Sequence, residues 1–161
     1  MSSYLTHSRC LSGQSSSGEQ TEEVTDRLTP TRRSKNMAAI RSKDTLPELT
    51  VRRWLHRQGF RYRLHRAGLP GRPDLVFSGQ KKVIFVHGCF WHQHPIAECR
   101  DSRRPKSRLE YWEQKLSLNV ARDARNQVQL EAAGWKVLVV WECETKDLTT
   151  LGPRLRSFLK P

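Results

Sequence analysis

The sequence has few acidic residues and no long apolar run. Its 16 Asp and Glu residues face 29 Lys and Arg residues, so the formal net charge is +13 at pH 7. No apolar stretch reaches the ~18–20 residues that a transmembrane helix needs. No charged start followed by an apolar stretch indicates a signal peptide. These absences argue against a membrane-spanning or secreted protein, and we expect a soluble intracellular one.

Cysteine is also scarce, and no two cysteines form a tight CxxC pair. The chain has four, at Cys10, Cys89, Cys99 and Cys143. In a chain that is not secreted, isolated cysteines favour metal ligation over disulfides.

The basic charge is spread unevenly along the chain. Residues 1–30 hold two arginines against four acids and are rich in Ser, Gly and Thr. Such a segment buries too little apolar surface to offset its ordering entropy, so we predict a disordered tail over 1–30 and one folded domain over 31–161. A large positive charge on a small domain repels itself unless a polyanion binds. Nucleic acid is the expected partner, with RNA and an anionic membrane surface as alternatives.

The apolar and turn-forming residues predict a single mixed α/β domain. Gly79 lies in a turn between two apolar runs, which indicates a hairpin, and the last strand reads as buried on both faces. The predicted helices are 31–40, 45–58, 106–133 and 147–159, and the predicted strands are 60–65, 74–77, 81–87 and 135–142.

Within the long helix, apolar or small residues recur in steps of three and four. We expect them to form one face against the core. They are Leu109, Trp112, Leu116, Val120, Ala124, Val128 and Ala132.

The stretch VHGCFWHQHPIAEC at 86–99 concentrates metal-binding side chains. Cys89, His94, Cys99 and the distant Cys143 form a Cys₃His set, which suits tetrahedral Zn²⁺. Four ligands would close the coordination sphere, so the ion would be structural and would fix this loop to the end of strand 135–142. In the alternative, the cysteines are small buried hydrophobic residues and the histidine lies on the surface.

Asp74 opens a strand directly after Gly71-Arg72-Pro73, a suitable place for Mg²⁺, which prefers oxygen ligands. The hairpin brings it near Val86 and His87, and the pairing register decides which of the two shares its face. His87 and His92 remain outside the zinc set and can transfer protons near neutral pH. Taken singly, each of these residues is more often structural.

Phe90 and Trp91 form an apolar pair in a very basic chain. Such aromatics can stack on bases or wedge between base pairs, or they can be core side chains under the loop. Trp112, on the apolar helix stripe, favours the core reading. The basic runs at 31–35 and 100–108 are typical of phosphate contacts.

At this point the motifs resemble a known family. GRPDLVF, VIFVHGCFWHQH, SRLEYW…NVARDARN and GWKVLVVWEC follow one another in the order found in the very short patch repair (Vsr) DNA mismatch endonucleases, and TRRSKNMAAIRSKDTLPE precedes them. The likeness covers about residues 31–144. It implies a restriction-endonuclease-like fold, a mixed sheet flanked by helices with a structural zinc site. It also implies a single-strand nick 5′ to the T of a T:G mismatch left by deaminated 5-methylcytosine.

The resemblance also implies residue roles. Asp74 matches the Mg²⁺-binding aspartate, and the main-chain carbonyl of Val86 faces the metal. His92 matches the general base, and His87 and Glu48 match further active-site positions. The implied zinc ligands are Cys89, His94, Cys99 and Cys143, and the implied intercalating residues are Phe90, Trp91, Trp112 and, from the other groove, Met37.

The sequence departs from the family pattern at two places. Val86 stands where a well-known member has threonine, and the span between His94 and Cys99 is longer. The second acid and lysine of many restriction-type nucleases are absent, so histidine chemistry would replace them.

Two other functions remain as alternatives. A zinc-stabilised DNA-binding module without catalysis leaves Asp74, His87 and His92 without a role, and a same-fold nuclease can have a different DNA target. We expect a monomer, because nicking one strand needs one site. The resemblance further implies a bacterial, cytoplasmic, nucleoid-associated protein, with other mismatch-repair proteins as further partners.

Overall fold

The computed structural model describes residues 29, 31–32, 35 and 43–160. The predicted disordered tail lies almost wholly outside these residues, as do most of the predicted helix 31–40 and Met37. The division of the chain at residue 30 therefore stays a prediction.

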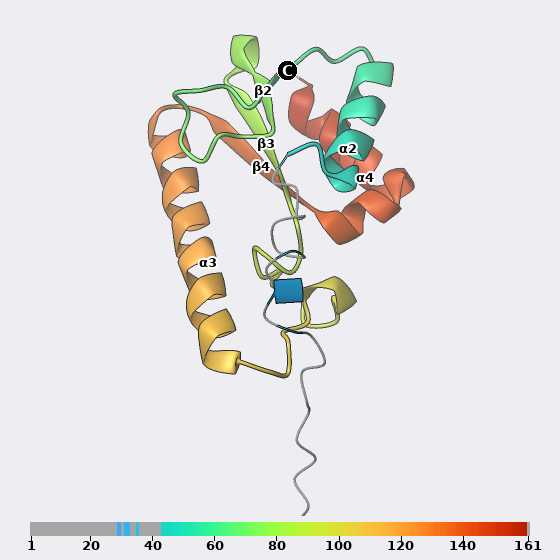
Figure 1. Ribbon diagram of the computed structural model, residues 1–161. Coiled ribbons are helices and arrows are strands. Elements are labelled where there is room, and N and C mark those ends of the chain that lie inside the picture. The colour runs from blue at the N-terminus through green and yellow to red at the C-terminus, as the bar shows by residue number, and fades with distance from the viewer. Residues whose placement is uncertain (1–28, 30, 33–34, 36–42, 161) are drawn as a thin grey trace, which may run out of the picture.

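Four strands form one mixed sheet in the order β1-β2-β3-β4. β1 pairs with β2 and β2 with β3 in antiparallel fashion, whereas β3 and β4 are parallel and joined through a long helix. The fold class, a mixed sheet with flanking helices, is confirmed (Figure 1). The strands are β1 Arg63–Leu64, β2 Leu75–Phe77, β3 Lys82–His87 and β4 Lys136–Trp141.

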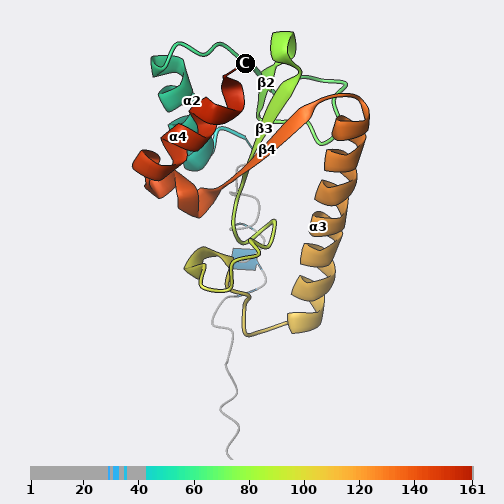
Figure 2. The same cartoon turned by 180° about the vertical axis from the view of Figure 1, so that it is seen from behind.

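Helices cover both faces of the sheet. α2 (Leu46–Arg57) and α4 (Leu148–Leu159) lie on one side and α3 (Leu109–Ala132) on the other, as both views show (Figures 1 and 2). Because side chains alternate along a strand, the sheet feeds two cores. Leu75, Phe77 and Ile84 pack with α2 and α4, whereas Val76, Val83 and Phe85 pack with Leu130 of α3.

Helix α2 begins at a capping box. The Glu48 main-chain N–H donates to Thr45 Oγ1 at 3.4 Å, and the Thr45 N–H donates to Glu48 Oε2 at 3.0 Å. This reciprocal pair fixes the first turn. It also holds Glu48 in the interior, where only 2% of the residue is exposed, so the sequence reading of a solvated first-turn acid is wrong.

Helices α2 and α4 approach each other closely at a glycine. A Cβ on Gly152 would lie 2.7 Å from Trp54 Cζ2, so only glycine allows this contact without movement of the ring. Asp147 caps α4 by accepting a hydrogen bond from the Thr149 N–H at 2.9 Å. The predicted helix 147–159 is thus confirmed.

The predicted apolar face of α3 is wrong. Leu109, Val120 and Val128 are 58%, 42% and 65% exposed. From Trp112 onward the predicted positions advance in steps of four residues, and each step turns the side chain about 40° beyond a full turn. The stripe therefore winds around the helix and leaves the core. The face turned inward is largely polar and consists of Trp112, Lys115, Leu116, Asn119, Asp123, Asn126 and Leu130.

Two strand predictions also need correction. The predicted strand 60–65 is reduced to Arg63–Leu64, both exposed. β4 reads as buried on both faces, but Val140 alone among its residues is completely buried, because β4 is the edge strand of the sheet. In the described part of the chain, no helix is both long and apolar enough to span a membrane.

Candidate active site and metal centre

A cavity of about 930 Å³ lies between the start of α2, the adjoining ends of β2 and β3, and the inner face of α3. It is lined by acids and histidines that the sequence singled out, Asp74, His87 and His92. Basic side chains border the same cavity, at Lys43, Arg72 and Arg122. A cleft with this composition can bind an anionic backbone next to reactive groups.

Asp74 forms the acidic half of the cleft. The ladder between β2 and β3 pairs Leu75 with Ile84, and just beyond it Asp74 Oδ2 accepts a hydrogen bond from the Val86 N–H at 2.7 Å. The register that the sequence leaves open thus joins Asp74 to Val86. Burial raises the pKa of Asp74 to about 7; the Val86 hydrogen bond opposes this rise and the neighbouring Glu48 carboxyl adds to it. Two adjacent buried carboxyls are a donor set that fits a hard divalent cation.

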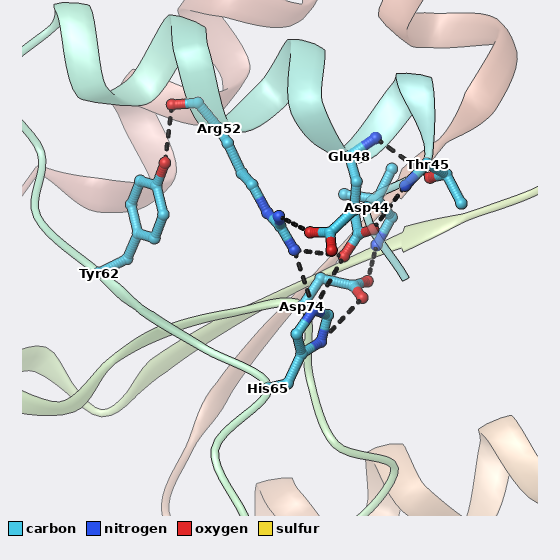
Figure 3. A network of polar contacts seen from close by, with 8 residues as sticks. Asp44, Thr45, Glu48, Arg52, Tyr62, His65 and Asp74 are labelled. Atoms are coloured by element: carbon cyan, nitrogen blue, oxygen red, sulfur yellow. Dashed lines mark hydrogen bonds and ion pairs between the residues drawn. The ribbon is translucent and has the colours of Figure 1, made fainter. Parts of the chain in front are cut away.

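Glu48 reaches this half of the site through a network that the sequence reasoning missed (Figure 3). Arg52 donates to Glu48 Oε1 at 2.8 Å and also contacts Asp44. His65 Nε2 lies 2.9 Å from the Arg52 guanidinium, and its Nδ1 lies 3.8 Å from Asp74 Oδ1. No spacing motif links these residues, because the turns before α2 and after β1 bring them together.

His87, His92 and Asp123 form the other half. The two imidazole rings stack with centroids 3.9 Å apart and planes 10° from parallel. Burial, with the nearby His92 charge, lowers the pKa of His87 to about 4, so His87 is neutral at pH 7. His92 Nδ1 bonds to Asp123 Oδ2. A carboxylate only accepts, so this contact keeps the proton on Nδ1 and leaves Nε2 free to accept another.

Asp123 is a site residue that the sequence analysis did not select. It lies on the inner face of α3, within NVARDARN, where it is the one acid of that motif. Burial favours its neutral form, but the hydrogen bond and charge of His92 lower its pKa overall. Its isolation among arginines was a usable signal.

The Cys₃His residues converge as predicted. One ligand atom from each of Cys89, His94, Cys99 and Cys143 lies within 4.8 Å of all the others, so the cluster can hold a metal ion. Cys143 Sγ lies 3.5 Å from His94 Nδ1, and the Cys143 N–H donates to Cys89 Sγ at 3.4 Å. Burial raises the pKa of Cys89 to about 12, whereas the His94 hydrogen bond lowers that of Cys99 to about 7. The cluster joins the loop after β3 to the segment after β4.

The predicted aromatic residues gather in one cluster. Phe90 lies 5.0 Å from Trp91 and 5.3 Å from Trp112, measured between ring centroids. All three are partly exposed and lie outside both core clusters, so the core reading of Trp112 is wrong. Tyr111, which the sequence analysis missed, packs 5.3 Å from Trp112, and the Lys115 ammonium lies 5.5–5.7 Å from the Trp91, Tyr111 and Trp112 rings.

Comparisons with known proteins agree with this site. The family model of the DNA mismatch endonuclease Vsr matches residues 25–98. The chain is 54% identical over 138 residues to the type II nicking enzyme V.XorIIP of Xanthomonas oryzae pv. oryzae, covering 86% of this chain and 99% of that protein. It is 46% identical over 121 residues to the DNA mismatch endonuclease Vsr of Escherichia coli, covering 75% and 74%. Among solved structures, the catalytic domain of the homing endonuclease I-Bth0305I matches with a TM-score of 0.49 and 20% identity, over 71% of this chain and 94% of that one.

A cleft that combines carboxylates, histidines and bordering arginines, in a chain with these relatives, defines a DNA endonuclease, a hydrolase of phosphodiester bonds. More narrowly, the chain belongs to the Vsr family of DNA mismatch endonucleases. The resemblance found in the sequence is thereby confirmed, and the alternative of a binding module without catalysis is set aside.

Proposed function

We propose that this endonuclease nicks one strand of duplex DNA, 5′ to the T of a T:G mismatch produced by deamination of 5-methylcytosine. The main support is the convergence in one cleft of the buried Asp74 carboxyl, bound to the Val86 main chain, and the His92–Asp123 pair. The relative from Escherichia coli is named a mismatch endonuclease and others are named nicking enzymes. Both names fit the cutting of a single strand.

The acidic half of the cleft would hold the catalytic metal. The Asp74 carboxylate and the main-chain carbonyl of Val86 would supply the oxygen ligands for Mg²⁺. When bound, Mg²⁺ stabilises negative charge on the scissile phosphate and on the leaving oxygen. Glu48, held next to Asp74 by Arg52, would orient water at this position.

The histidine half would move the proton. His92 Nε2 accepts a proton from the attacking water, while Asp123 keeps Nδ1 protonated and stabilises the charge that develops on the ring. His87 stays neutral against the ring of His92 and fixes its plane. Attack on the phosphate then leaves a 5′-phosphate and a 3′-hydroxyl.

The aromatic cluster would select the mismatch. Phe90, Trp91 and Trp112 would wedge into the base stack beside the T:G pair, whose weaker stacking lowers the cost of deforming the duplex. The Cys₃His cluster would hold Zn²⁺ and so fix the loop that presents Phe90 and Trp91. Metal analysis should find about one zinc per chain. A metal-free protein that keeps its melting temperature and activity would contradict the zinc assignment.

The catalytic assignment is tested by nicking of a mismatched duplex by wild type and Asp74→Ala, each with Mg²⁺ and with EDTA. We expect nicking by wild type with Mg²⁺ and none in the other three reactions. An Asp74→Ala variant that nicks at the wild-type rate would remove the metal assignment. Light scattering of the active protein at the mass of one chain would support the expected monomer.

A further inference from the structure

The acidic half of the cleft contains a second position suited to a cation. One ligand atom from each of Asp44, Glu48 and His65 lies within 4.8 Å of the others. Two carboxylates and an imidazole at this spacing are a donor set that divalent metals accept. In this protein the position already holds a positive charge, because the Arg52 guanidinium lies among the three side chains (Figure 3).

The Arg52 side chain is held firmly in this place. It is 8% exposed and uses both terminal nitrogens, one toward Asp44 and the other toward Glu48 and His65. The Tyr62 hydroxyl donates to the Arg52 carbonyl at 2.9 Å and ties this turn of α2 to the segment before β1. Its Nε finds no hydrogen-bond partner among the described residues, so the guanidinium is satisfied by this cluster alone. A guanidinium does not lose its proton, which makes it a permanent cation.

We propose that Arg52 is a positioning residue that takes the place of a second metal ion at Asp44, Glu48 and His65. It holds Glu48 and His65 next to Asp74 and leaves the acidic half of the cleft with one metal position. This inference rests on the proposed function, in which Asp74 binds that metal. Removal of the guanidinium would uncover a site that a divalent cation can enter.

The test counts Mn²⁺ ions bound to the zinc-loaded full chain, by calorimetry and by electron paramagnetic resonance. Arg52→Met should bind one more ion than wild type, and Arg52→Met combined with Asp44→Asn should lose that ion again. Asn suits this position because Asp44 has a left-handed backbone (φ 55) that Asn tolerates. Arg53→Met, an exposed arginine one position along the same helix, is the matched control and should bind as wild type does.

Nicking provides a second readout. At low Mg²⁺ Arg52→Met should nick about 10–100-fold more slowly than wild type, because residues behind a metal ligand typically contribute that factor. High Mg²⁺ should restore part of the rate, as a cation refills the position. A merely structural arginine would show no such metal-dependent rescue.

Two results would overturn the inference. One is an unchanged number of Mn²⁺ ions in folded Arg52→Met, and the other is the loss of an ion from wild type on Asp44→Asn substitution. If Arg52→Met does not fold, the comparison of wild type with Asp44→Asn decides, and equal ion numbers support the inference. Failure of the proposed function has a different sign, since Asp74→Ala would then bind as many ions as wild type.

Discussion

At the scale of single residues, the cleft places two aspartates in opposite environments. Asp74 is buried beside another carboxyl, so its pKa rises to about 7, whereas Asp123 bonds to His92 and its pKa falls. The first environment favours a bound cation and the second favours a protonated imidazole. Two carboxyls of one residue type therefore serve two different roles.

The raised pKa predicts that Asp74 destabilises the metal-free protein at neutral pH. Its carboxyl titrates ordinarily at 3.8 and in the folded chain at about 7, so the folded state binds the additional proton between these values. Stability is thus lost as pH rises from about 4 to 7. In EDTA, Asp74→Asn should melt at a higher temperature than wild type at pH 8, by on the order of a few kcal/mol at ~1.4 kcal/mol per pKa unit.

The difference between Asp74→Asn and wild type should disappear near pH 4, where both side chains are neutral in both states. Thermal melts of the two proteins across this pH range measure it. An equal melting temperature at every pH would show that the carboxyl is not held in the environment described.

A second prediction concerns Asp123. Asp123→Ala removes the acceptor that orients His92, and nicking should slow by about 10²–10⁴-fold, the usual contribution of a positioned base. The pH–rate profile should also lose its basic limb at the wild-type position. Glu113→Ala changes an exposed acid on the same helix and should nick at the wild-type rate. Equal rates for the two variants would contradict the proton-transfer role.

Residue identity predicted part of the candidate site. The structure brings Asp74, His87 and His92 to one cavity and the Cys₃His residues to one cluster, as the sequence led us to expect. Arg52, His65 and Asp123 escaped notice because their roles depend on long-range contacts. The His92–Asp123 contact spans 31 residues and the Arg52–His65 contact 13, and neither repeats at a recognisable spacing.

At the scale of elements, local chemistry predicted most helices and strands, and tertiary packing set the rest. The capping box at Thr45, the hairpin around Gly79 and the cap at Asp147 lie where the sequence places them. The inward face of α3 could not be inferred from apolar spacing, because that face lines the cleft. It carries polar side chains for the site, so the periodic apolar residues point elsewhere.

The contact between α2 and α4 predicts a large effect of one methyl group. Gly152→Ala places a Cβ against the Trp54 ring, which is in contact with the core, and should reduce the unfolding free energy by about 1–3 kcal/mol, as overpacking does. Gly79→Ala is the control, since no atom lies within 4 Å of its Cβ position. Denaturant unfolding of both variants measures the difference. Equal stabilities would disprove the close approach.

At the scale of the whole molecule, the cleft is assembled from two sides. The α2 side and β2 supply the carboxyls, β3 and α3 supply the histidines and Asp123, and the loop between β3 and α3 supplies most of the aromatic cluster. The net charge of +13 surrounds this arrangement with basic residues that attract the phosphate backbone. Only the complete fold joins the three parts, so no single segment of the sequence could reveal the site.

Selective nicking is the central claim, and end-labelled duplexes test it most directly. One duplex holds a single T:G mismatch at a cytosine-methylation site, and the other is fully paired and otherwise identical. With Mg²⁺, we predict one nick, in the T strand of the mismatched duplex, on its 5′ side. Cutting of both duplexes alike would contradict the mismatch assignment and indicate a Vsr-family nuclease with a different DNA target.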